Sequence, residues 1–126
     1  MKSRELFDSA LALIGESEDS GEDYSERAPY ILAIFCDKVA SIDKTFRETH
    51  GLLPQKSFNE VYISLTDEFP LCSRFVDSAV HYLAAMLVTY ENEDLHDKLF
   101  SIHCDMLSAA ISEIPYSNEK IKNAYC

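Results

Sequence analysis

The chain has 126 residues, of which 22 are acidic and 11 basic, so its formal net charge at pH 7 is −11. This balance argues against binding to nucleic acid or to an anionic membrane surface, because both need clustered Lys and Arg. The length allows one domain with a modest core, and the small number of glycines and prolines favours helices.

The first predicted helix covers residues 3–14. Ser3 is a suitable N-cap, and Gly15 is placed to end the helix. Residues 15–23 then hold five acids, two glycines and no large apolar anchor, so we expect a solvated, mobile loop. The apolar residues at helical spacing in the first helix are Leu6, Phe7, Ala10, Leu11 and Ile14.

The second predicted helix covers residues 25–50, with Pro29 in its early turns and Gly51 after its end. Tyr30 and Ile34 lie well away from its main apolar stripe, so this helix has apolar residues on two faces in its first half. The main stripe is Ala28, Ile31, Phe35, Val39, Ile42 and Phe46.

Residues 51–70 do not have a helical pattern. Within them Val61, Ile63 and Leu65 alternate with polar or aromatic residues, which predicts a short extended segment at residues 60–65. One such segment cannot form a sheet alone, so it either packs on helices or pairs with another chain.

The third predicted helix starts between residues 70 and 73 and ends at residue 91. Its apolar run at residues 79–90 is too short for a membrane span, which needs roughly 20 residues. We therefore expect a soluble protein with no membrane partner. The helix has one apolar stripe of Val76, Val80, Leu83, Leu87 and Tyr90 and a second of Phe75, Tyr82 and Met86.

The fourth predicted helix covers residues 92–114, with Asn92 as a plausible cap and Pro115 as its stop. The sequence thus predicts an all-α fold, a small bundle of about four helices in a single domain of residues 1–115. Residues 116–126 are expected to form a flexible tail.

A helix with two apolar faces is either central within its fold or also contacts another subunit. With only four helices, little protein is available to cover both faces of each. The candidate residues for contact with another copy or with a partner are Tyr30, Ile34, Phe75, Tyr82 and Met86.

The residue types that carry chemistry form no recognisable motif. His96 and His103 share a helix face next to Cys104, but a transition-metal site needs three or four convergent ligands. Cys36 lies among apolar residues that would raise its pKa, and the acids of residues 15–23 are not in the register of a calcium loop. We therefore expect no catalytic residue, no metal and no cofactor; a metal- or thiol-dependent enzyme using His96, His103 and Cys104 is the least favoured alternative.

Several stretches resemble the helical head–tail connector (adaptor) proteins of tailed bacteriophages and prophages. They are the turn DEFP at residues 67–70, the centre AVHYLAAMLV at 79–88 and the turn YENED at 90–94. The openings ELFDSALALIGE and YSERAPYILAIFCDKV also fit prophage members of this group. The YENED turn departs from the YENRE-like ending of one connector branch.

The resemblance implies a structural protein of virion assembly, in which copies of this chain form an oligomeric ring between the portal and the tail or stopper proteins. DNA would pass through the ring without sequence-specific binding, and an acidic lumen would repel its phosphates. The protein would be in the host cytoplasm during assembly and then at the head–tail junction of the virion. A small helical regulatory module that binds a partner helix in a groove is the alternative.

Overall fold

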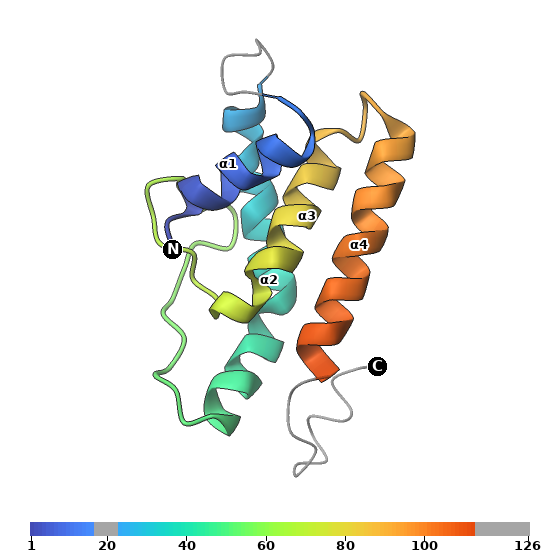
Figure 1. Cartoon of the computed structure of the whole chain (residues 1–126). Helices are drawn as coiled ribbons and strands as arrows, with labels where there is room; N and C mark the ends of the chain where they lie inside the picture. Colours follow the sequence, from blue (N-terminus) through green and yellow to red (C-terminus); the bar gives the residue numbers. More distant parts are fainter. Residues whose placement is uncertain (17–22, 113–126) are drawn as a thin grey trace.

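The computed structural model describes residues 1–16 and 23–112. The described residues form four α-helices and no strand, which confirms the predicted all-α bundle (Figure 1). The expected behaviour of most of the acidic loop (residues 17–22) and of the tail (116–126) lies outside the described residues. The helices are α1 (Ser3–Leu13), α2 (Tyr24–Thr49), α3 (Val76–Leu87), preceded by a single 3-10 turn η1 (Ser73–Phe75), and α4 (Glu93–Ser112).

Helix α3 is the centre of the bundle. The helices α1, α2 and α4 surround it, and α4 runs antiparallel to it on one side (Figure 1). Leu83 and Leu87 of α3 are completely buried, as are its three alanines. The central position explains why a short helix in an acidic protein is apolar on nearly every face.

Glycines end α1 and α2 as the sequence predicts. Gly15 and Gly51 have φ angles of +72° and +64°, in the left-handed region that residues with a Cβ avoid. The amide nitrogens of Glu16 and Leu52, one residue further on, donate to the carbonyl oxygens of Leu11 and Arg47 at 3.0 and 2.9 Å. Each helix thus ends in the six-to-one hydrogen bond of a Schellman motif.

The predicted cap of α1 is wrong. Ser3 is the first helical residue, Lys2 occupies the cap position, and the Ser3 side chain is fully buried. The backbone nitrogen of Ser3 instead donates to the Asp67 carbonyl oxygen at 2.9 Å, and Lys2 pairs with Glu68 in an isolated antiparallel bridge. A distant segment therefore satisfies the start of this helix, and local sequence could not reveal it.

The third helix ends earlier than predicted. It stops at Leu87, and residues 88–91 form a turn. Tyr90 is therefore not part of the buried stripe and is 92% exposed. The predicted cap of α4 is confirmed, because the Asn92 side-chain oxygen accepts a hydrogen bond from the Leu95 amide at 3.0 Å.

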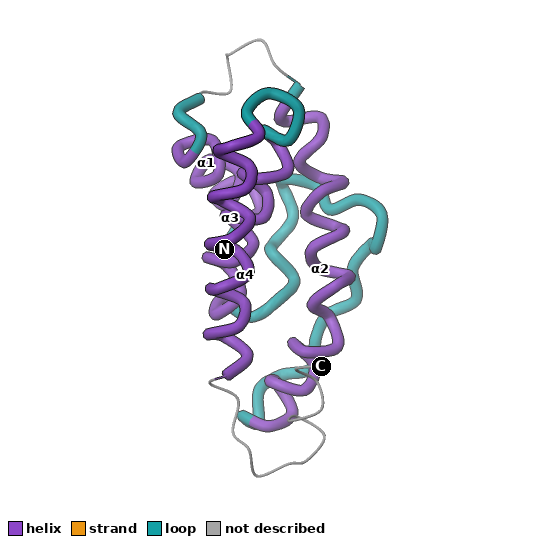
Figure 2. Tube along the Cα trace, turned by 90° about the vertical axis from the view of Figure 1, so that its right-hand side faces the viewer, coloured by secondary structure: helices purple, strands orange, loops and turns teal. Residues whose placement is uncertain are grey.

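Residues 51–72 form an irregular linker that runs back along α2 (Figures 1 and 2). The predicted extended segment at residues 60–65 forms no strand. Of its alternating residues Ile63 is buried and its amide donates to the Pro29 carbonyl oxygen at 3.1 Å, whereas Val61 is 69% exposed. The segment thus packs on α2 through Ile63 and through Tyr62, whose ring centroid lies 5.0 Å from that of Tyr30, and Leu65 packs against the core.

A buried carboxylate attaches this linker to α2. Asp43 is fully buried, and its oxygens accept hydrogen bonds from Arg47 Nε at 2.8 Å, Gln55 Nε2 at 2.7 Å and the Cys72 amide at 2.8 Å. Gln55 also donates to the Ala40 carbonyl oxygen at 3.2 Å. Both ends of the linker are therefore fixed to the same turn of α2.

Within the described part of the chain, no helix combines the length and the apolar character that a bilayer crossing requires.

Candidate functional site

An apolar groove lies between α2 and α3, near the end of the molecule where α3 turns into α4. Its volume is about 370 Å³. We call it the α2–α3 groove, and its lining residues are Arg27, Tyr30, Ile31, Ile34, Tyr82, Met86, Thr89 and Tyr90.

The groove joins residues that the sequence placed on separate stripes. Tyr30 and Ile34 form one edge and are 52% and 55% exposed. Met86 is half-buried, and Tyr82 is only 7% exposed, so it forms the floor. Four of the five predicted contact residues therefore lie around one hollow and do not form two separate surfaces.

The floor of the groove is an aromatic cluster. The Tyr82 ring lies 5.6 Å from Phe35 of α2 and 5.0 Å from His103 of α4, measured between ring centroids. Burial raises the pKa of the Tyr82 hydroxyl, and the Lys38 ammonium lies 5.7 Å from the centre of its ring. Because three helices hold it, the floor is preorganised.

Arg27 is the charged residue of the lining. Its Nη2 donates to the Leu87 carbonyl oxygen at 2.6 Å, which satisfies an orphan carbonyl at the end of α3. Its Nε lies 3.7 Å from the Asp23 carboxylate, and the adjacent Tyr24 hydroxyl donates to Glu91 at 2.7 Å. These bonds hold the start of α2 against the turn after α3, so the groove is rigid at this end.

Phe75 does not belong to the groove. It lies on η1, its side chain is fully buried, and it packs edge-to-face against Phe46 with the ring centroids 6.3 Å apart. Its predicted role as a contact residue is corrected to that of a core residue. The prediction assumed one continuous helix, whereas η1 changes the helical phase before α3 begins.

The histidines have structural partners. His103 is 1% exposed, and its Nδ1 lies 2.9 Å from the Ser78 hydroxyl and 3.1 Å from the Ser78 carbonyl oxygen. Burial lowers the pKa of His103. His96 Nδ1 lies 2.8 Å from the Ala85 carbonyl oxygen, and His81 Nδ1 lies 2.8 Å from that of Asp77. Since a carbonyl oxygen only accepts, Nδ1 of these three rings carries the proton.

Two of the cysteines that the structure describes, Cys36 and Cys72, have thiols whose pKa is raised and which are therefore not activated. Cys36 is completely buried, and desolvation raises its pKa to about 12, as the apolar surroundings predict. Cys104 is exposed on α4. Among the described residues, no three His, Cys, Asp or Glu side chains are grouped so that they could hold a metal ion. The groove itself has the features of a contact surface, since the exposed Tyr30 and Ile34 border an apolar hollow.

Sequence reasoning missed four lining residues, Arg27, Ile31, Thr89 and Tyr90. Tyr90 was assigned to a buried stripe, and Arg27 has no apolar periodicity that would draw attention to it. The only available signal was the position of Arg27 three residues before Tyr30, on the same helical face.

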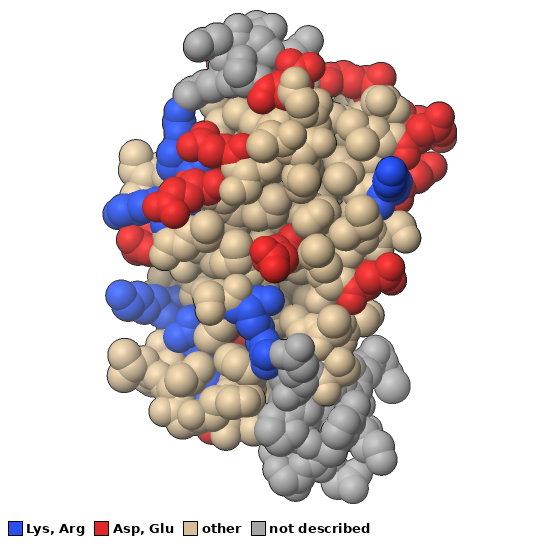
Figure 3. All heavy atoms as spheres, in the orientation of Figure 1, with Lys and Arg blue, Asp and Glu red and all other residues tan. Residues whose placement is uncertain are grey.

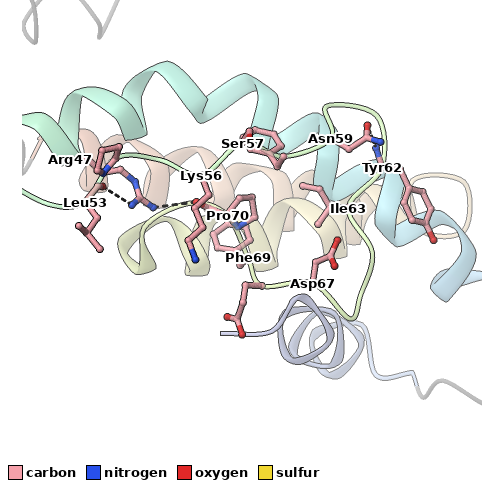
Figure 4. A pocket seen from close by; sticks show the side chains of 13 residues that line it. Arg47, Leu53, Lys56, Ser57, Asn59, Tyr62, Ile63, Asp67, Phe69 and Pro70 are labelled. Atoms are coloured by element: carbon pink, nitrogen blue, oxygen red, sulfur yellow. Dashed lines mark hydrogen bonds between the residues drawn. The ribbon is translucent and has the colours of Figure 1, made fainter.

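A second, larger hollow of about 620 Å³ lies under the linker (Figure 4). Arg47 lines one end and donates to the carbonyl oxygens of Leu53 at 3.1 Å and Pro70 at 3.2 Å, as the dashed lines show. Lys56 and Asp67 bring opposite charges to the same hollow. Its lining mixes these charged groups with apolar side chains and gives no single ligand chemistry.

Comparison of the chain with protein-family models, with curated proteins and with solved structures finds no significant match.

Proposed function

We propose that this protein is a head–tail connector subunit that acts by assembly and not by catalysis. The observation that carries the proposal is the α2–α3 groove, in which Tyr30, Ile34 and Met86 leave an apolar hollow open on a strongly acidic protein. An exposed apolar hollow with a rigid floor is typical of a protein–protein contact. The sequence resemblance to connector proteins supplies the kind of assembly.

The charge of the chain is consistent with this function. A net charge of −11 would let DNA pass through a ring without adhering to its wall, since phosphates are repelled. The partners would be other copies of the chain, the portal, and the tail or stopper proteins. The protein would then move from the host cytoplasm to the virion.

The same groove also supports the alternative, a small regulatory module that holds an amphipathic helix of a partner. Such a helix would place apolar residues at positions i, i+4 and i+7 along the α2–α3 groove. A connector subunit would bind the portal, whereas a regulatory module would bind another partner. Binding to the portal therefore distinguishes the two functions.

The test is to mix purified portal protein with this protein and to image the complex by electron microscopy. We expect added density at the tail-facing end of the portal. Ile34→Asp should abolish this density, because it places a charge in the groove, while its circular-dichroism spectrum stays helical. Tyr82 is unsuitable for this substitution because it is part of the buried floor.

The matched control is Leu13→Asp, which adds the same charge at a 40% exposed leucine of α1. It should leave portal binding unchanged. If the wild-type protein binds neither its cognate portal nor the adjoining tail proteins, the connector function is wrong and the regulatory module replaces it.

A further inference from the structure

Among the described residues, the most exposed pair of adjacent apolar side chains lies far from the groove. Leu52 and Leu53 are 48% and 81% exposed, and they follow directly after the end of α2. We call this pair the leucine tip. Figure 1 shows that α2 ends at the opposite end of the molecule from the turn between α3 and α4.

The distance between the two sites prevents contact within one subunit. Ile34 and Thr49 are separated by 15 residues of one α-helix, which is about 22 Å at 1.5 Å per residue. Any occupant of the α2–α3 groove that resembles the leucine tip must therefore come from another molecule.

The leucine tip is held in place. The Arg47 guanidinium donates to the Leu53 carbonyl oxygen at 3.1 Å, and the Leu52 amide donates to the Arg47 carbonyl oxygen at 2.9 Å. Arg47 is itself fixed by the buried Asp43. Two exposed leucines on a fixed backbone lose little conformational entropy when they bind, which favours affinity.

The charges around the two sites are complementary. Two exposed lysines, Lys44 and Lys56, and one exposed acid, Glu48, lie around the leucine tip and leave it with an excess of positive charge. At the groove, Asp23 offsets the charge of Arg27, and Glu91 adds a negative charge where α2 begins. On the face drawn in Figure 3, acidic side chains gather toward the end that carries the α3–α4 turn, and basic ones lie mainly on the left and in the lower half. Two copies arranged head to tail would therefore attract each other at this contact.

We infer that the leucine tip of one copy docks into the α2–α3 groove of the next copy. The contact is heterologous, because each copy uses its tip on one side and its groove on the other. Such a contact repeats until it closes into a ring or continues as a filament. This inference rests on the proposed function for the closure of the ring. A ring subunit needs two different contact surfaces, and because Tyr30, Ile34, Tyr82 and Met86 form only one of them, the leucine tip supplies the other.

Site-specific photo-crosslinking tests the contact directly. A copy with Leu53→benzoylphenylalanine is mixed with isotope-labelled wild-type protein, irradiated, and its crosslinked peptides are identified by mass spectrometry. The mixture is used at about 1 mM protein, where even a contact with a Kd of about 1 mM is well populated. We expect crosslinks to labelled peptides that contain Ile34 or Met86, and none from the same probe at Leu13.

Complementation then tests the head-to-tail direction. Ile34→Asp destroys the groove and keeps the tip, whereas Leu53→Asp destroys the tip and keeps the groove. Each variant alone should lose the association of the wild-type protein, and their equimolar mixture should form dimers and nothing larger, because only one intact contact remains. A mixture that stays monomeric, or that assembles as far as the wild-type protein does, overturns the inference.

The inference and the proposed function fail in different ways. Crosslinks between tip and groove without any binding to portal would keep the contact and reject the connector. Portal rings in which the Leu53 probe crosslinks outside the groove, or not at all, would keep the connector and reject this contact.

Discussion

At the scale of single residues, Asp43 shows what the sequence conceals. It occupies the apolar side of α2 between Val39 and Arg47, where a carboxylate would be very unfavourable without partners. The structure gives it three donors, one from the next turn of the helix and two from the linker. The available local signal for this site was an acid on an apolar stripe with an Arg four residues later. Gln55 and Cys72 are distant along the chain and are brought to Asp43 only by the fold, which no local pattern encodes.

Replacement of Asp43 by Ala should lower the free energy of unfolding by about 3–5 kcal/mol, because the substitution leaves Arg47 partly buried without its counter-charge. The loss is measured by urea denaturation. Asp37→Ala, at an exposed acid on the same helix, is the control and should change stability by less than about 0.5 kcal/mol. Equal effects of the two substitutions would show that the carboxylate does not anchor the linker.

His103 should make stability depend on pH. Burial lowers its pKa in the folded protein, so the unfolded chain binds more protons near the ordinary histidine pKa of about 6.5. The free energy of unfolding should therefore fall as pH decreases from about 7 toward the lower folded pKa, with a slope of at most about 1.4 kcal/mol per pH unit. Urea titrations of His103→Gln should lose this slope, whereas those of His81→Gln, at the half-exposed ring on α3, should keep it.

At the scale of helices and loops, the sequence predicts what is set locally. The glycine stops of α1 and α2 and the Asn92 cap follow from backbone preferences within a few residues, so each is found. The start of α1 and the end of α3 depend on Asp67 and on Arg27, which are distant in sequence. The local pattern therefore assigned the wrong cap to α1 and extended the third helix to residue 91, beyond its end at Leu87.

Gly51→Ala should destabilise the protein by about 1–2 kcal/mol, the energy needed to hold a residue with a Cβ in the left-handed region. A Cβ at this position would have no atom within 4 Å, so the effect is one of backbone conformation alone. Gly51→Asn is the matched control and should lose less, since Asn tolerates this conformation. Thermal denaturation that ranks Asn below Ala would contradict this reason.

Leu83→Ala should lower the free energy of unfolding by about 2–5 kcal/mol, because it removes methyl groups from the middle of the packed bundle. Leu83 is completely buried on the central helix. Val61→Ala, at a 69% exposed side chain of the linker, should have little effect in the same urea titration. A small effect at Leu83 would mean that α3 is not the centre of the core.

At the scale of the whole molecule, the sequence identified the surplus apolar residues but not their grouping. Tyr30 and Ile34 are separated from Tyr82 and Met86 by about fifty residues of chain, and only the packing of α2 against α3 joins them. The burial of Phe75 in the core depends on the change of helical phase between η1 and α3. The candidate surface was thus predictable as a set of side chains, and its shape required the fold.

The excess of 22 acidic over 11 basic residues should make the folded subunit sensitive to salt. Like charges repel more strongly in the compact state than in the expanded unfolded chain, and ions screen them within about 10 Å at 0.1 M salt. Raising sodium chloride from low to high concentration should therefore increase the unfolding temperature, while it weakens the charged part of the contact between leucine tip and groove.

Reversal of two exposed acids of α4, Asp97→Lys with Asp105→Lys, should reduce the increase in unfolding temperature, because less repulsion remains to be screened. An unfolding temperature that falls with salt, or a charge-reversed variant with an undiminished increase, would show that self-repulsion does not limit stability.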